Sequence, residues 1–589
     1  MRRRYAAILA GCAVFAVGAC GGLSTSSAIQ PGLEVGSVQD NAVRVEVNPV
    51  APGSSPQQVV QGFIRAAAAS DDGYQAARSF LGAGPQGTWR PDSSVVVFGS
   101  ESDLTYKSSS ANTVTAVANA VARIDGSGRY EELPPATRVQ VTFGLARTGG
   151  EWRISAMPDS FGTWLSQADL DRLYDPFRIY YVSAGDHRLV PDIRWLPLGT
   201  GLATRLARSL LTGVPPYLRG AVRTDIPSGT QLAVDAVTID AGTAKVDLAA
   251  TPLGNDPGQR QNLGAQFLAT VTQAPGVERV ALRLEGAALQ MPNGASTVDS
   301  LSVLGFATPS DPVVKPVLRV GTTLVPVDPN DVGDTVQQRT PLPNSSTLPT
   351  VQPGWAYLAL SRNGQEVAAV GGDRAQLARW RGTTQVQLIS PGTQLTRPTY
   401  DREDVLWVAG RGTGGATIWA INSAADPGDT TKSSPQAVAV DWLAGRSVVS
   451  LRLAPDGQRI AVVSTKVDGT DPHVDVAGVV RQPNGLPASL AEPLRLAPTL
   501  TLARDLVWVD DATLAVLGRL NPSQVIRPWL VPLGGAIAAG PDIAGAQSIT
   551  TVNGERGLVV TTDKHQVLIR AGSRWQRVGE GADLMVAAR

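Results

Sequence analysis

The sequence is short of the residues that build disulfides and metal sites. Among its 589 residues there are two cysteines and three histidines. Cys12 lies inside an apolar run near the N-terminus, and Cys20 follows that run. Cleavage before Cys20 would leave a single cysteine, which excludes an internal disulfide and a metal site built from several cysteines. We therefore expect hydrophobic cores alone to hold the mature protein together, without a metal or another cofactor.

An excess of charge of either sign is also missing. Lys plus Arg and Asp plus Glu each number 51, so the formal net charge is zero. A nucleic-acid-binding protein needs a basic face or a basic domain, so nucleic acid is not expected as a partner. The hydrophobic fraction of 43% permits large cores, and the length of 589 residues predicts several domains.

Motifs that carry catalysis are absent as well. His187, His473 and His565 are isolated in the sequence, and neither H-E-x-x-H, G-x-S-x-G nor a Walker motif occurs. We expect His187 and His473 to be exposed loop residues. Acidic residues cluster in 70–73 and 401–404, but both clusters lie in predicted turns, where solvated acids are common. No catalytic residue and no metal ligand is therefore predicted, and the chain is not expected to be an enzyme.

Two further features have a structural and a functional interpretation. Asp456-Gly457 is typical of a β-turn, and this is favoured over a calcium site because the alternating acidic pattern is missing. Tryptophans recur at related places in the C-terminal half, where packing is favoured over a binding groove. These tryptophans are Trp355, Trp407, Trp442, Trp508 and Trp529.

The N-terminus has the pattern of a secretion signal. The basic Met1–Arg4 precedes the apolar Tyr5–Gly18, which is shorter than the roughly 20 residues that a membrane span needs. We expect residues 1–19 to be a signal peptide cleaved between Ala19 and Cys20. An uncleaved anchor helix is the alternative, disfavoured because glycines flank Ala19 and Cys20.

The tetrad Val17-Gly18-Ala19-Cys20 resembles the bacterial lipobox. Small residues before the cysteine let an extended backbone enter a narrow peptidase site. The resemblance implies that Cys20 carries an S-diacylglycerol and an N-acyl chain. Two or three acyl chains anchor a protein stably, whereas one does not. We therefore predict a lipid-anchored protein on the outer face of a cytoplasmic membrane.

Residues 20–50 are rich in Ser, Gly and Pro and predict a flexible tether. From 51 to 160 a helix capped by Ser55 and a second helix over Tyr74–Leu81 are expected to precede a curved antiparallel sheet. This order, ending in G-G-E-W-R-I, resembles the NTF2-like fold. Its expected strands are Ser94–Phe98, Thr113–Ile124, Thr137–Arg147 and Trp152–Ala156.

Residues 161–308 resemble the GerMN domain. A hairpin turning at Gly185-Asp186 is followed by an amphipathic helix that Gly213 ends, and by a second hairpin turning at Ala241-Gly242. The motifs that carry the resemblance are Ile226–Thr230, Val246–Leu248, and Pro275–Val277 before a strand over Arg279–Leu284.

Residues 309–352 are rich in Pro, Thr and Asn and predict a linker. From 353 to 589 the chain repeats an apolar strand, an Asp/Asn/Gly turn and another apolar strand, about every 40 to 55 residues, which is typical of propeller blades. Five blades are evident. A sixth is expected in weaker segments, or in a ring closed with Val320–Pro326.

The sequence therefore predicts two α+β domains, NTF2-like and GerMN-like, followed by an all-β propeller. With the lipobox, this order is similar to the LpqB lipoprotein family of actinobacteria. The resemblance implies an accessory role in the MtrA–MtrB two-component system, with the ectodomain of the sensor histidine kinase MtrB as partner. The alternative is a scaffold or carbohydrate-active protein that has cell-wall components as partners.

Overall fold

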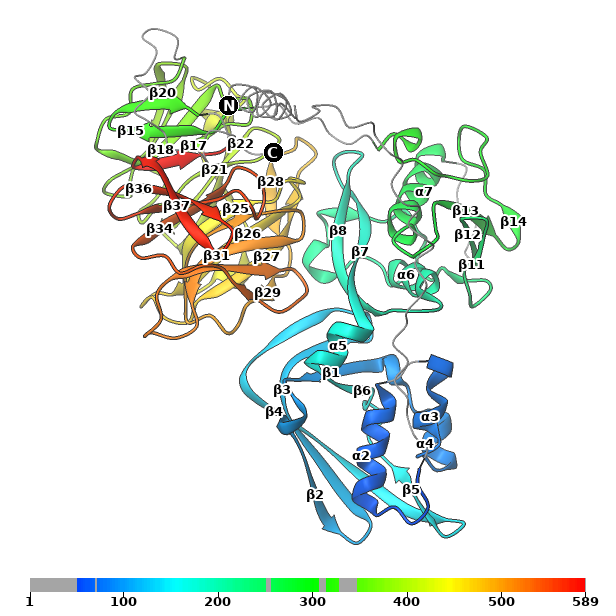
Figure 1. Cartoon of the computed structure of the whole chain (residues 1–589). Helices are drawn as coiled ribbons and strands as arrows, with labels where there is room; N and C mark the ends of the chain where they lie inside the picture. The colour runs from blue at the N-terminus through cyan, green and yellow to red at the C-terminus, as the bar shows by residue number, and fades with distance from the viewer. Residues whose placement is uncertain (1–49, 69–70, 250–255, 307–313, 328–346, 588–589) are drawn as a thin grey trace, which may run out of the picture. The chain divides into compact units, whose positions relative to one another are not determined.

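A computed structural model describes residues 50–68, 71–249, 256–306, 314–327 and 347–587 (Figure 1). The predicted signal peptide, and the tether apart from Val50, lie outside this range. Among the described residues no helix combines the length and the apolar character needed to cross a membrane.

The N-terminal domain begins with the predicted helix. The Ser55 hydroxyl accepts a hydrogen bond from the Gln58 amide, and the Gln58 side chain accepts one from the Ser55 amide, so Ser55 is confirmed as the cap. Val59, Val60 and Phe63 on this helix are fully buried against the sheet. The elements are α2 (Pro56–Ala67), α3 (Gln75–Arg78), α4 (Ala83–Thr88), β1 (Ser94–Phe98), β2 (Leu104–Ser110), β3 (Thr113–Asp125), β4 (Tyr130–Thr148), β5 (Glu151–Ala156), β6 (Thr163–Ser166) and α5 (Gln167–Leu173).

The sheet of this domain has the order β5-β4-β3-β1-β6, with β2 paired to β3. Its last strand, β6, pairs in parallel with β1, from Val95 opposite Thr163 to Phe98 opposite Ser166. The first domain therefore extends beyond residue 160, where the sequence placed its end. A parallel partner that lies far along the chain has no local signal, which is why the sequence did not show it.

The second domain packs two helices against two small sheets, of order β8-β7-β9 and β10-β12-β13-β14, with β11 paired to β12. Ala241 and Gly242 have positive φ angles of 45° and 75° and confirm the predicted tight turn. The elements are β7 (Tyr174–Ser183), β8 (Leu189–Pro197), α6 (Leu202–Leu211), β9 (Val222–Arg223), β10 (Gln231–Leu232), β11 (Thr238–Asp240), β12 (Thr243–Ala249), α7 (Pro257–Val271), β13 (Arg279–Leu284) and β14 (Ala287–Ala288).

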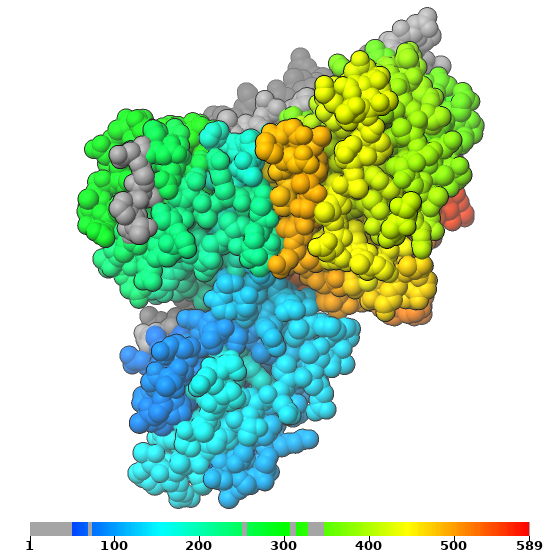
Figure 2. Space-filling view, turned by 180° about the vertical axis from the view of Figure 1, so that it is seen from behind, coloured from blue at the N-terminus to red at the C-terminus, as the bar shows by residue number. Residues whose placement is uncertain are grey.

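The C-terminal domain is a propeller, in which the described residues form six sheets. Consecutive blades follow one another across the surface from yellow-green to orange (Figure 2). Blade 1 has β17 (Trp355–Leu360), β18 (Glu366–Gly371), β19 (Leu377–Arg381) and β20 (Thr384–Ile389). Blade 2 has β21 (Thr399–Tyr400), β22 (Val405–Gly412), β23 (Gly415–Asn422), the short α8 (Thr430–Ser433) and β24 (Gln436–Val438).

The next three blades repeat the pattern. Blade 3 has β25 (Arg446–Leu453), β26 (Arg459–Lys466), β27 (His473–Arg481), β28 (Pro487–Leu490) and β29 (Leu494–Leu496). Blade 4 has β30 (Leu502–Trp508), β31 (Thr513–Arg519), β32 (Arg527–Pro532) and β33 (Ala538–Ala539). Blade 5 has β34 (Ala546–Thr551), β35 (Leu558–Thr562), β36 (Gln566–Ala571) and β37 (Arg574–Glu580).

Blade 6 joins the two ends of the propeller sequence. Its sheet has the order β16-β15-β38, where β15 (Val317–Val320) and β16 (Thr323–Pro326) precede blade 1 and β38 (Asp583–Met585) follows blade 5. Leu318 pairs with both Val325 and Leu584. The segment predicted as a linker therefore contributes two strands to the propeller. The fold class, two α+β domains followed by an all-β propeller, is confirmed.

Candidate functional site

The residues of the predicted lipid-attachment site, Val17, Gly18, Ala19 and Cys20, lie outside the described residues. The cleavage site and the lipid on Cys20 therefore stay predictions. The acidic cluster 70–73 is only partly described. Ser70 lies outside the described range, and Asp71 begins a short 3-10 helix.

The three histidines lie apart from one another. His187 in the β7–β8 turn and His565 after β35 are exposed, as expected for His187. His473 is different: it begins β27, its side chain is 20% exposed, and its Nε2 lies 3.4 Å from Asp471. The expectation of an exposed loop was wrong there, because His473 belongs to β27 and pairs with Ser464 of β26. Across the described ranges, no cluster of His, Cys, Asp or Glu has the form of a metal site.

The acidic cluster 401–404 lies in a turn, as predicted, but its first acid is not solvated. Asp401 is 1% exposed and accepts hydrogen bonds from the Val405 amide at 2.8 Å and the Trp407 indole at 2.9 Å. Its Oδ2 also pairs with Arg481 at 2.8 Å. Burial, reinforced by the charge of Asp401, raises the pKa of Glu403 to about 6. These acids hold blades 2 and 3 together, which the local turn pattern could not show.

The remaining sequence features are structural. The Gly457 amide donates to the Ala454 carbonyl at 2.9 Å, which confirms the predicted β-turn at Asp456-Gly457. Trp407, Trp508 and Trp529 are buried, as the packing interpretation expected, and Trp508 also lines the cavity on the propeller axis. Trp355 and Trp442 are half-buried, with Trp442 donating from its indole to the Ala491 carbonyl.

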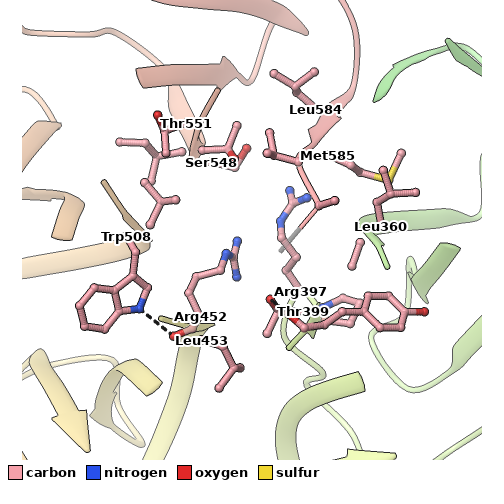
Figure 3. A pocket seen from close by; sticks show the side chains of 18 of the residues that line it. Leu360, Arg397, Thr399, Arg452, Leu453, Trp508, Ser548, Thr551, Leu584 and Met585 are labelled. Atoms are coloured by element: carbon pink, nitrogen blue, oxygen red, sulfur yellow. Dashed lines mark hydrogen bonds between the residues drawn. The ribbon is translucent and has the colours of Figure 1, made fainter. Parts of the chain in front are cut away.

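A cavity with polar and apolar walls lies on the propeller axis, where the inner strands of the blades meet (Figure 3). Its volume is about 130 Å³, and all six blades contribute to its wall. The inner strands of blades 3, 4 and 5 each shift register just before a polar residue, namely Ser450, Asp505 and Ser548. Of these, Ser548 lines the cavity. No local sequence signal marked this site.

Two arginines point into the cavity from blades 2 and 3, Arg397 and Arg452 (Figure 3). Arg397 Nη1 pairs with Asp583 at 2.7 Å and donates to the Leu358 carbonyl at 3.0 Å. Asp583 also accepts from the Leu358 amide at 3.0 Å. This carboxylate therefore connects blade 6 to blade 1 and holds the first arginine in place.

Arg452 is held in a related way by blade 4. Its Nη2 lies 3.3 Å from Asp505 Oδ1, and its Nη1 donates to the Leu451 carbonyl at 2.7 Å. Asp505 also accepts from the Ser450 hydroxyl at 2.6 Å and the Ile549 amide at 3.0 Å. Burial lowers the pKa of Arg452, and the charge of Arg397 adds to this effect, while Asp505 opposes it.

A second cavity, of about 420 Å³, lies in the N-terminal domain between α2 and the sheet. Its wall includes the apolar residues Phe98 and Trp164 and the acidic residues Glu101 and Asp169. Asp169 accepts from the Ser166 hydroxyl at 2.7 Å and pairs with Arg172 at 2.6 Å. One of the two carboxylates is therefore already engaged in structural bonds.

Strand β8 supplies contacts to both neighbouring domains. The Trp195 amide donates to the Gly128 carbonyl at 2.7 Å, and its indole donates to the Gly534 carbonyl at 2.9 Å. Ile193, two residues before Trp195, is buried in one hydrophobic cluster with residues of blades 3 and 4. The second domain is thus joined to the first and to the propeller by buried contacts.

The three domains define a class of proteins in which two α+β domains precede a propeller. Sequence models match each of them: "Lipoprotein LpqB, N-terminal domain" over residues 49–171, "Sporulation and spore germination" over 178–290, and "Lipoprotein LpqB beta-propeller domain" over 337–585. The chain belongs to the LpqB family of actinobacterial lipoproteins.

Relatives named Lipoprotein LpqB match almost end to end. The one from Cutibacterium acnes is 26% identical over 99% of this chain and 98% of its own length. The one from Thermobifida fusca is 28% identical over 90% of each chain. The one from Streptomyces coelicolor is 27% identical over 98% of this chain and 97% of its own.

Proposed function

We propose that the protein is a lipid-anchored accessory protein on the outer face of the cytoplasmic membrane, where it binds and modulates a sensor histidine kinase of the MtrB type. The observation that carries the proposal is the end-to-end similarity to proteins named Lipoprotein LpqB. The protein acts by binding and not by catalysis, and through the kinase it influences the homeostasis of the cell envelope.

The anchor in this proposal is Cys20. Cleavage after Ala19 frees the amine of Cys20 for acylation, and the added chains hold the protein at the membrane without a spanning helix. Tethering confines the protein and the kinase ectodomain to one surface, which raises their effective concentration. A weak interface is then sufficient for binding.

The buried contacts of β8 support a role in which the domains act together. Trp195 bonds to Gly128 in the first domain and to Gly534 in the propeller. A partner bound to one domain can therefore influence the position of the neighbouring domains. A binding surface of this kind rests on a few apolar, aromatic or Arg residues scattered along the chain.

The test is crosslinking and affinity capture from membranes, with the native protein and Cys20→Ala. Loss of the anchor should leave the variant unprocessed or released from the membrane, with most of the kinase capture lost. A Cys20→Ala protein that is processed and membrane-bound like the native one contradicts the anchor. Recovery of no sensor kinase with either protein contradicts the signalling role and favours a cell-wall scaffold.

A carbohydrate-active protein is the second candidate, because Glu101 and Asp169 line one cavity. Glycosidases use two carboxylates on either side of the scissile bond. Incubation of purified protein with peptidoglycan, and analysis of the released fragments, tests this. If the native protein releases peptidoglycan fragments and Glu101→Gln does not, the protein is an enzyme and the proposed binding role is wrong.

A further inference from the structure

The two arginines on the propeller axis have hydrogen-bond donors left over. Arg397 makes its bonds to Asp583 and Leu358 through Nη1. Arg452 makes its bonds through Nη1 and Nη2. Within the described part of the chain, Nε and Nη2 of Arg397 and Nε of Arg452 find no acceptor. A guanidinium has five N–H donors in a planar fork, so each arginine keeps an edge available to another group.

The nearby carboxylates do not use these edges. Asp583 binds the Leu358 amide and one nitrogen of Arg397, and Asp505 binds the Ser450 hydroxyl, the Ile549 amide and Arg452. These acids are committed to the backbone of the next blade. They bind the guanidinium groups from outside the cavity wall, and Arg397 and Arg452 themselves point into the cavity (Figure 3).

The cavity has room for a small ligand. Water occupies about 30 Å³ per molecule in the liquid, so the volume of about 130 Å³ matches a few waters or one small anion. Ser548, Thr399 and Thr551 add hydroxyl groups to the wall. An anion between the arginines would also offset the burial and the mutual repulsion that lower the pKa of Arg452.

We propose that this cavity binds a small oxyanion, a phosphate or a carboxylate group, through the free guanidinium edges of Arg397 and Arg452. Arginine suits this role because its planar donors match two oxygens of a carboxylate or phosphate at once. The site lies where all six blades meet, so its occupant also bridges blades 2 and 3. This inference is independent of the proposed kinase partner.

The experiment uses the full-length protein in detergent at constant ionic strength. Inorganic phosphate and acetate are titrated by calorimetry, and the thermal midpoint is measured with each anion against chloride. We expect saturable binding and a raised midpoint with phosphate, acetate or both. Tighter binding of phosphate identifies a tetrahedral oxyanion, and tighter binding of acetate identifies a carboxylate. If neither anion differs from chloride, the proposal is wrong.

Arg452→Gln should weaken the binding at least tenfold, because it removes one of the two charged forks. Arg574→Gln is the matched control, since Arg574 is exposed at the start of β37 and its loss should leave the affinity unchanged. If Arg452→Gln does not fold, Arg452→Lys keeps the charge but loses the planar fork, and binding should still be weaker than in the native protein. Undiminished binding in the folded variant overturns the proposal.

Discussion

Buried arginines are used in two different ways within the propeller. In the body of blade 1, Arg379 is fully buried and every guanidinium nitrogen has an acceptor, with Glu366, Gln387 and the Ser423 carbonyl as partners. On the axis, Arg397 and Arg452 are partly paired and face a cavity. The same side chain is a crosslink where its donors are all satisfied, and an open binding group where they are not.

The largest effect is expected where the crosslink is removed. Arg379→Met should destabilise the propeller by about 3 kcal/mol, because it leaves Glu366 buried with fewer partners. The midpoint of chemical denaturation, followed by tryptophan fluorescence, measures this. Arg574→Met, which removes an exposed arginine, is the control. If Arg379→Met lowers the free energy of unfolding by less than about 1 kcal/mol, Arg379 is not an important crosslink.

A smaller effect is expected on the axis. Asp583→Asn keeps the shape of the side chain but removes the charge that pairs with Arg397, and we expect a cost of about 2 kcal/mol. The cost is lower than for Arg379→Met because the freed guanidinium borders a cavity that can admit water. Denaturation of the two variants side by side tests this order. The opposite order would mean that the ion pair on the axis contributes as much to stability as the arginine crosslink in the body of the blade.

The smallest effect concerns pH at the edge of blade 2. The folded-state pKa of Glu403 is raised to about 6 from a usual 4.5, so its ionised form destabilises the fold at neutral pH. Stability should therefore rise as the pH falls from about 7 towards 4.5. The side chain is 32% exposed, which screens the effect to about 1 kcal/mol or less.

Glu403→Gln should remove this pH dependence. The variant should be more stable than the native protein near pH 7.5, and the difference should vanish near pH 4.5. Thermal melts across this range measure it, with the exposed Glu131→Gln as control. A difference that is the same at both ends of the range would show that the charge of Glu403 is not responsible.

Local features were predictable where one short segment carried the whole signal. The cap at Ser55, the turn at Ala241-Gly242 and the strand β13 follow from neighbouring residues. The burial of Asp401 did not, because the ion pair at its carboxylate comes from Arg481, which lies 80 positions away on blade 3. The strand position of His473 did not follow either, because it depends on the pairing of β27 with β26.

The sequence by itself determined the order of domains, the blade repeat and most of the turns, because periodicity and turn chemistry act over a few residues. Only the tertiary structure decided how the ring closes and what lies at its centre. Arg397 and Asp583 are 186 positions apart, and they meet because β38 returns to pair with β15. A contact of that kind depends on the geometry of all six blades at once, and no local pattern encodes it.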